Sequence, residues 1–310
     1  MKKTFLVTSF SRYITLSILI VCANTSAYAQ SDSGVVVPEY DLHMYKQDSL
    51  YFSAPHLFKQ IAYTPSNIWQ IAKAPFQKRN LPALAAVAVS TGVLIAEDQN
   101  IINGVRHFSD QIGLSPNTNY HIAFQVGDTK IIKIPKNLNT GLYQLGEGGT
   151  SMILAGGMAV YGAISKDRRA MATAIDLTET FVTMGLTTQI LKRMTGRESP
   201  FVSTKSGGAW RPFPSFKEYQ TNTSNYDGFP SGHLSTLMAT ITVLSYNYPE
   251  KKWIKPVGYS IMSLSAWAMM NTEVHWAGDY PLALAIGYLS GRITTMRHRV
   301  KPEQKVKSYL

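Results

Sequence analysis

The sequence predicts an all-α fold, a helical bundle of about six core helices. From residue 81 onward, apolar segments of helical length alternate with polar loops. Two of these loops are long: residues 98–148, which we expect to contain short helices, and residues 197–229, and neither carries a repeat. The core helices are expected at residues 81–96, 149–165, 170–191, 233–247, 254–270 and 280–296.

The amino terminus has the features of an export signal. Lys2 and Lys3 precede an apolar stretch at residues 14–22, and residues 27–29 form a small-x-small cleavage pattern. We therefore expect residues 1–29 to be a cleaved signal peptide. The mature protein is then expected in a bacterial-type periplasm, soluble or membrane-associated. An uncleaved membrane anchor is the alternative interpretation.

Charge and cysteine content limit the kinds of partner. The chain has a formal net charge of +11 and one cysteine, Cys22, which the predicted cleavage removes. The mature protein then has neither a disulfide nor a cysteine nucleophile. Its positive charge favours anionic lipid headgroups or phosphorylated substrates, although a generic surface charge explains it equally well. No basic helix or aromatic–basic pattern predicts nucleic-acid binding.

Residues 30–80 are predicted to form an amino-terminal extension with an amphipathic region. Residues 64–67 have a composition that can cap a helix carrying Ile68, Trp69 and Ile71. Such a helix can lie on a membrane surface or pack against the main domain, and we favour packing.

The core segments at residues 81–297 are expected to form one helical domain, with a basic tail at residues 298–310. Gly156 and Gly162 in the second segment allow close helix packing, whereas Asp176 interrupts the third segment. The uncharged runs are shorter than the roughly 20 residues that a membrane span needs. We therefore favour a water-soluble or peripheral bundle over an embedded one.

Chemically useful side chains lie at the ends of these segments. Lys192 follows the third segment, residues 230–233 (PSGH) open the fourth, and His275 and Asp279 lie between the fifth and sixth. If successive helices run up and down, these residues meet at one end of the bundle.

The two histidines suggest phosphoryl transfer. At i and i+4, Asp279 can face His275 across one helical turn, hold one ring nitrogen and leave the other as a nucleophile. His233 follows a Ser-Gly turn at a predicted helix start, where backbone N–H groups can hold an anion. Two histidines beside an anion site are typical of a phosphohistidine mechanism.

Three sequence blocks resemble those of the type 2 phosphatidic acid phosphatase and vanadium haloperoxidase superfamily. The family blocks are Lys-x6-Arg-Pro, Pro-Ser-Gly-His and Ser-Arg-x5-His-x3-Asp. This chain has residues 192–200 for the first, residues 230–233 for the second and residues 268–279 for the third. The resemblance extends over roughly residues 81–297 and implies the helical bundle of that superfamily.

The resemblance also implies a role for each matching residue. His275 would attack phosphorus, Asp279 would orient the His275 ring, and His233 would protonate the departing alkoxide. The residues that would bind phosphate oxygens are Lys192, Ser231 and Gly232.

Two arginines of the family pattern are replaced in this chain, by Ser199 and Met269. Each would normally contribute a charge-assisted contact to phosphate of roughly 1.5–3 kcal/mol. We place Arg197, two residues before the first gap, among the phosphate-binding residues. Other nearby arginines that can fill a gap are Arg193 and Arg211.

We expect neither a metal site nor a cofactor. The remaining histidines have no partner at metal-ligand spacing. Glu273 is unusual beside an anion site, because its carboxylate would repel phosphate unless an arginine pairs with it. Trp276 either walls the pocket or fills the core.

These expectations favour a metal-independent, acid-phosphatase-like phosphohydrolase of the cell envelope, acting on a lipid phosphate or diphosphate at a membrane surface. Small soluble phosphate esters are the nearest alternative substrates. Vanadate-dependent halide oxidation is disfavoured, because vanadate should require even more cationic ligands. A different class of function, favoured by Ser199 and Met269, is a catalytically weakened protein that binds phosphate or phospholipid.

Overall fold

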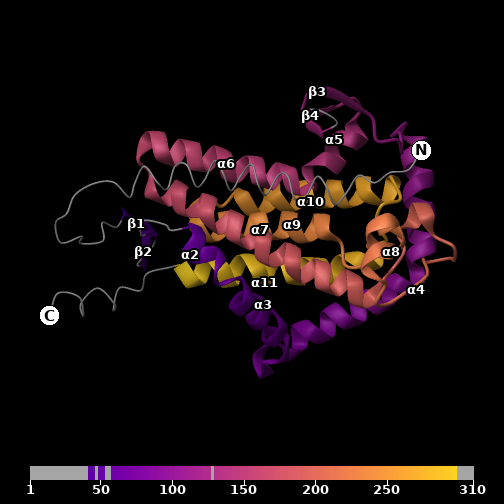
Figure 1. Cartoon of the computed structure of the whole chain (residues 1–310), viewed down its shortest axis with the longest axis horizontal. Helices are drawn as coiled ribbons and strands as arrows, with labels where there is room; N and C mark the ends of the chain where they lie inside the picture. Colours follow the sequence, from indigo (N-terminus) through magenta and orange to yellow (C-terminus); the bar gives the residue numbers. More distant parts are fainter. Residues whose placement is uncertain (1–40, 46–47, 53–56, 127–128, 299–310) are drawn as a thin grey trace.

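The computed structural model describes residues 41–45, 48–52, 57–126 and 129–298. The predicted signal peptide and the predicted basic tail beyond His298 lie outside these ranges. Helices dominate the described chain, as predicted (Figure 1). Its β structure consists of two separate antiparallel hairpins, β1 (Asp41–Tyr45) with β2 (Asp48–Phe52) and β3 (Tyr120–Val126) with β4 (Thr129–Pro135).

All six predicted core segments are helical. Helices α7, α9 and α11 pack against one another, α6 covers α7, and α10 covers α9. The helices are α4 (Leu81–Gln111), α6 (Gly148–Ser165), α7 (Arg168–Thr195), α9 (Gly232–Asn247), α10 (Ile254–Asn271) and α11 (Tyr280–His298).

Helix α4 is longer than predicted. We expected a loop from residue 98, but the helix continues to Gln111 because its buried face continues at helical spacing. That face carries polar as well as apolar side chains, which made it resemble a loop in the sequence. Its buried residues are Asp98, Ile102, Val105 and Ser109.

The remainder of the first long loop folds into the β3–β4 hairpin and helix α5 (Leu138–Leu145). The side chain of Asn137 caps α5 by accepting a hydrogen bond from the Thr140 amide at 2.7 Å. Tyr143 of α5 joins a buried cluster with Leu234 and Met269, which connects α5 to α9 and α10. The segment from β3 to α5 is thereby fixed against the beginning of α9.

The amino-terminal extension packs on the bundle through α2 (Leu57–Ile61) and α3 (Thr64–Lys73). Asn67 of α3 is buried, and its amide donates to Glu179 Oε1 of α7 at 2.7 Å. The outward side of this region exposes large aromatic side chains, Phe58 (71%), Trp69 (63%) and Phe76 (72%). The extension therefore has one face packed on the domain and one apolar face exposed.

Within the described ranges, one segment is long and apolar enough to cross a membrane by length and composition, Lys78–Gln111. It comprises the short 3-10 turn η2 (Lys78–Asn80) and α4. None of its most apolar window is buried in the protein. Other core helices also expose apolar side chains, for example Ile153 and Ile164 of α6.

Candidate active site

The three sequence blocks meet at one end of the bundle, as the predicted helix order requires. Lys192 lies in the last turn of α7, His233 in the first turn of α9, and His275 in the connection between α10 and α11. His233 Nδ1 lies 3.2 Å from His275 Nε2, although 42 residues separate them in sequence. The fold therefore brings the two predicted catalytic histidines into direct contact.

The hydrogen bonds of His275 define which of its nitrogens can react. The ring is buried, and Nδ1 lies 2.9 Å from the Gly228 carbonyl oxygen. Because a carbonyl only accepts, Nδ1 must carry the proton, and Nε2 of the neutral ring then has a free lone pair. Burial, with the charge of Lys192, lowers the pKa of His275 to about 3. At neutral pH, His275 is therefore an uncharged ring with a nucleophilic Nε2.

His233 is the donor in the contact between the two rings, because His275 Nε2 can only accept. The ring of Tyr143 lies 5.2 Å from that of His233. Burial, followed by the charges of His275 and Lys192, lowers the pKa of His233 well below its usual value. Without a ligand both rings are neutral, and an anion bound beside His233 would favour its protonated form.

Asp279 lies close to His275 by a local geometry that differs from the prediction. Residues 277–279 form a 3-10 turn, η5 (Ala277–Asp279), and His275 lies before it. Asp279 Oδ2 is 3.5 Å from His275 Nδ1 and accepts the Trp276 amide at 2.8 Å. Burial raises the pKa of Asp279 to about 6, despite the opposing effect of Arg197 and the Trp276 amide. The carboxylate is thus a second partner of His275 Nδ1, at a longer distance than the Gly228 carbonyl oxygen.

The amino terminus of α9 faces the histidines. Ser231 is fully buried and caps α9, its Oγ accepting the Leu234 amide at 3.3 Å. Its own amide donates to the Asp279 carbonyl oxygen at 3.1 Å, which ties this helix start to η5. Gly232 and His233 are the first residues of α9, where backbone amides point out of the helix end.

Lys192 brings a positive charge to this helix end. Its Nζ donates to the Asp227 carbonyl oxygen at 2.7 Å and lies 3.8 Å from Asp227 Oδ2. A Cβ added to Gly232 would lie 3.8 Å from the same Nζ. Lys192 and the first amides of α9 can therefore contact one anion placed beside the His233–His275 pair.

Residues 173–301 match a family model described as the PAP2 superfamily. The match includes every predicted site residue, from Lys192 to Asp279. The chain is similar to that superfamily over this region. No curated protein and no solved structure gives a significant match to the chain. The match to the PAP2 superfamily supports a phosphatase-type activity in general.

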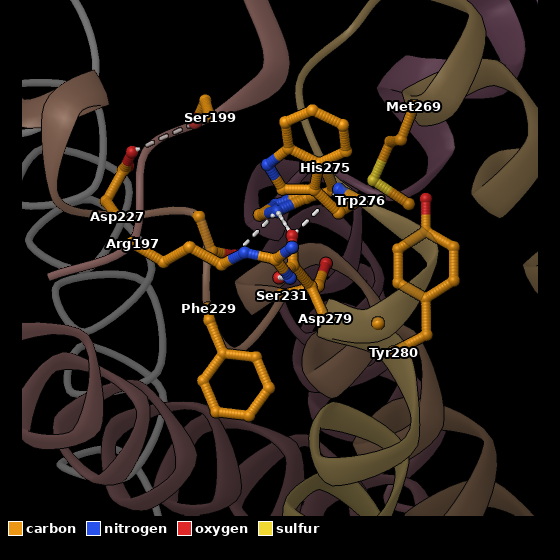
Figure 2. A network of polar contacts seen from close by, with 12 residues as sticks. Arg197, Ser199, Asp227, Phe229, Ser231, Met269, His275, Trp276, Asp279 and Tyr280 are labelled. Atoms are coloured by element: carbon orange, nitrogen blue, oxygen red, sulfur yellow. Dashed lines mark hydrogen bonds and ion pairs between the residues drawn. The ribbon is translucent and has the colours of Figure 1, made fainter. Parts of the chain in front are cut away.

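Arg197 of the PAP2 region has partners other than the predicted phosphate. Its side chain is fully buried, and one terminal nitrogen lies 2.7 Å from Asp279 Oδ1 (Figure 2). The other terminal nitrogen lies 2.5 Å from Asp98 Oδ2. It also donates to the Gly207 carbonyl oxygen at 2.7 Å. The geometry makes Arg197 a support of Asp279, which differs from the phosphate-binding role that we expected.

The other two nearby arginines are also held by protein groups. Arg193 donates to Gln189 Oε1 at 2.8 Å and stacks on the Tyr219 ring at 4.1 Å. Arg211 forms an ion pair with Glu198. Burial disfavours the charged form of Glu198, but hydrogen bonds from the Thr204 and Ala209 amides stabilise its carboxylate and lower its pKa. Neither guanidinium takes the place of the missing arginines in this structure.

The two replaced positions are buried and packed. Ser199 Oγ lies 3.4 Å from Asp227 Oδ1 (Figure 2). Met269 is fully buried in the cluster with Tyr143. Two expectations about neighbouring residues are also resolved. Glu273 is paired at 2.5 Å with Arg106 of α4, and Trp276 is buried and donates through Nε1 to the Glu198 carbonyl oxygen.

Sequence reasoning missed three groups that belong to the site. One is the Gly228 carbonyl, because backbone acceptors leave no sequence signal. Another is Asp98, which lies 99 residues before its partner Arg197. The third is Lys133 of β4, which lies 3.4 Å from Glu147 and whose charge contributes to the lowered pKa of His233. A lone lysine in a loop gave no motif to read.

Proposed function

We propose that this protein is a metal-independent phosphohydrolase of the cell envelope that acts on a lipid phosphate or diphosphate through a phosphohistidine at His275. The observation that carries the proposal is the pair of buried histidines. His275 presents an unprotonated Nε2 towards His233 at 3.2 Å, with its other nitrogen held by the Gly228 carbonyl. The match to the PAP2 superfamily over residues 173–301 supports the general reaction class.

The substrate phosphate first replaces the hydrogen bond between the two rings, because a separation of 3.2 Å leaves no room between them. Lys192, Ser231 and the first amides of α9 hold the phosphate oxygens. The negative charge of the phosphate then favours the protonated form of His233, which burial disfavours in the empty site.

In the first chemical step, the lone pair of His275 Nε2 forms a bond to phosphorus, and the bond from phosphorus to the alcohol oxygen breaks. The departing alkoxide takes a proton from His233. The phosphorylated ring keeps its proton on Nδ1 and therefore becomes positively charged. The nearby carboxylate of Asp279 stabilises that charge.

In the second step, water attacks phosphorus while the neutral His233 accepts one of its protons. The nitrogen–phosphorus bond breaks, and its electron pair returns to His275 Nε2. Inorganic phosphate leaves, and the original protonation state of both rings is restored once His233 releases its proton.

Several features support a lipid substrate and a location at the membrane. The exposed aromatic residues Phe58, Trp69 and Phe76 lie beside basic residues of α3 and of the turn before α4. The outward surface of α4 is apolar. Such a combination suits an interface with anionic lipid, and the export pattern predicted at residues 1–29 favours a periplasmic location for it.

A second candidate is a phosphate- or phospholipid-binding protein with weakened catalysis. The observation that favours it is that the three nearby arginines, Arg193, Arg197 and Arg211, all bind protein groups in place of a phosphate. Lys192 is then the one PAP2-pattern cation left at the site. The two candidates make opposite predictions for turnover.

The deciding experiment measures phosphate release by residues 30–310 in detergent without added metal. Substrates are phosphatidate, a polyprenyl diphosphate and a soluble aryl phosphate, each tested with wild type, His275→Ala and the control His107→Ala at an exposed site. The proposal expects turnover that only His275→Ala abolishes. Folded wild-type protein that binds phosphatidate without turning it over would favour the second candidate.

A further inference from the structure

A buried carboxylate outside the matched PAP2 region reaches the site. Asp98 lies on α4, is fully buried, and its Oδ2 is 2.5 Å from a terminal nitrogen of Arg197. Its other oxygen, Oδ1, accepts the Gly278 amide at 2.8 Å. One carboxylate thus contacts both Arg197 and the turn that carries Asp279.

The contact between α4 and this turn is close. A Cβ added to Gly278 would lie 2.6 Å from Ile95 Cγ1 and 2.8 Å from Asp98 Oδ2. Gly278 therefore permits η5 to approach α4, and a larger residue would have to push the two elements apart. The position of Asp279 depends on this approach.

The three side chains form a row of alternating charges, in which Arg197 lies between Asp98 and Asp279. Arg197 is enclosed by the rings of Trp210 at 4.9 Å and Trp276 at 5.4 Å, so its guanidinium is fixed between the two carboxylates. A single arginine opposite Asp279 alone would neutralise it. With Asp98 as a second anion, the group as a whole keeps one negative charge.

We propose that Asp98 is a positioning residue for phosphoryl transfer: by sharing Arg197 and binding the Gly278 amide, it keeps Asp279 in place and gives the three-residue group a net negative charge beside His275. This proposal rests on the proposed function, because the charge is needed when the His275 ring becomes a positively charged phosphohistidine. Asp98 does not contact the phosphate-binding groups, Lys192 and the start of α9. It should therefore affect kcat more than KM.

The test compares Asp98→Asn with the wild type and with Glu97→Gln, which removes an exposed carboxylate from the adjacent position of α4. Asn retains the shape and an acceptor for the Gly278 amide. We expect kcat to fall roughly 10- to 100-fold in D98N, as for a misplaced catalytic group, with KM nearly unchanged. E97Q should behave as wild type.

A double-mutant cycle separates this role from an independent structural one. If Asp98 acts through Arg197, the two side chains are one functional unit, and their effects on kcat are not additive. Arg197→Gln should therefore reduce kcat by a smaller factor in the D98N background than in the wild type. Independent, multiplicative losses in the folded variants would overturn the proposal.

A second readout does not depend on turnover. The titratable groups around Asp279 are Arg197, Asp98, His275, Lys192 and Tyr280. Loss of the neighbouring carboxylate in D98N should lower the pKa of Asp279 from about 6. Carbon NMR of the Asp279 carboxyl group measures this titration. An unchanged titration would overturn the role of Asp98, whereas absent wild-type turnover with the expected titration would overturn only the proposed function.

Discussion

At the scale of single residues, the backbone determines which nitrogen of the nucleophile is free. The Gly228 carbonyl lies 2.9 Å from His275 Nδ1, whereas the closest Asp279 oxygen lies 3.5 Å away. The carbonyl therefore selects the tautomer, and Asp279 contributes charge. A carboxylate in this position matters most when the ring is phosphorylated, because only then does the ring carry a positive charge.

This division of roles predicts a pH dependence. Burial raises the pKa of Asp279 to about 6, so its charge is present above that pH and lost below it, while His275, with a pKa of about 3, stays neutral throughout. We expect kcat/KM, which reports the pKa values of the free enzyme, to fall as the pH drops through about 6. In Asp279→Asn this limb should vanish, leaving only the ionisation of the substrate, which both proteins share. An identical acid limb in both would contradict this role.

At the scale of elements, the loop after α7 is fixed by a glycine that no other residue can replace without strain. Gly196 ends α7 with a φ of 58°, and an added Cβ would lie 1.8 Å from the Arg211 carbonyl oxygen. Arg197 follows directly, so the same turn aims the guanidinium towards Asp98 and Asp279. Local backbone geometry thereby positions the buried charge group.

Gly196→Ala should consequently destabilise the protein more than Gly113→Ala. Both glycines have left-handed φ angles, 58° and 70°, but nothing lies within 4 Å of a Cβ added at Gly113. We expect about 1 kcal/mol for Gly113→Ala and at least about 3 kcal/mol for Gly196→Ala, because the collision adds to the strain. Denaturant unfolding measures both, and equal losses would show that the collision is relieved at no cost.

At the scale of the whole molecule, a second polar network lies at the end of the bundle opposite His233 and His275. His298, at the end of α11, contacts Asp176 Oδ1 at 2.6 Å and Glu179 Oε2 at 3.1 Å on α7. Asn67 of α3 binds the same Glu179. The network joins the amino-terminal extension, α7 and α11, and thus stabilises the bundle that carries the site at its other end.

This network predicts a loss of stability at alkaline pH. Burial lowers the pKa of His298, but the hydrogen bonds to Asp176 and Glu179 outweigh it and raise the value to about 9. The stabilisation is complete below the unfolded value of about 6.5 and is lost as pH rises towards 9, by roughly 3 kcal/mol in total. His298→Gln should be less stable at pH 6 and should lack this dependence in denaturant unfolding. The same slope in both proteins would rule the network out as its source.

The sequence allowed the helices to be predicted better than the contacts between them. Apolar runs located all six core helices, and the motif order predicted that Lys192, His233 and His275 meet. The extension of α4 was missed because Asp98 and Ser109 are buried polar residues, which hydrophobic periodicity cannot distinguish from a loop.

The role of Arg197 shows why proximity in sequence to a motif is a weak guide. It lies two residues from a vacant phosphate-ligand position, yet its partners come from α4 and η5. Pairing over such separations depends on tertiary packing, which one sequence does not reveal. The same limit applies to Lys133, which the β3–β4 hairpin brings near His233.

The central claim is that His275 becomes covalently phosphorylated. The most direct measurement is rapid quenching of the wild-type protein with radiolabelled phosphatidate, followed by analysis of the protein-bound label. We predict a label that is stable in alkali, labile in acid, located on His275 and absent from His275→Ala. Turnover of the same substrate with no acid-labile label on His275 at any quench time would contradict the account.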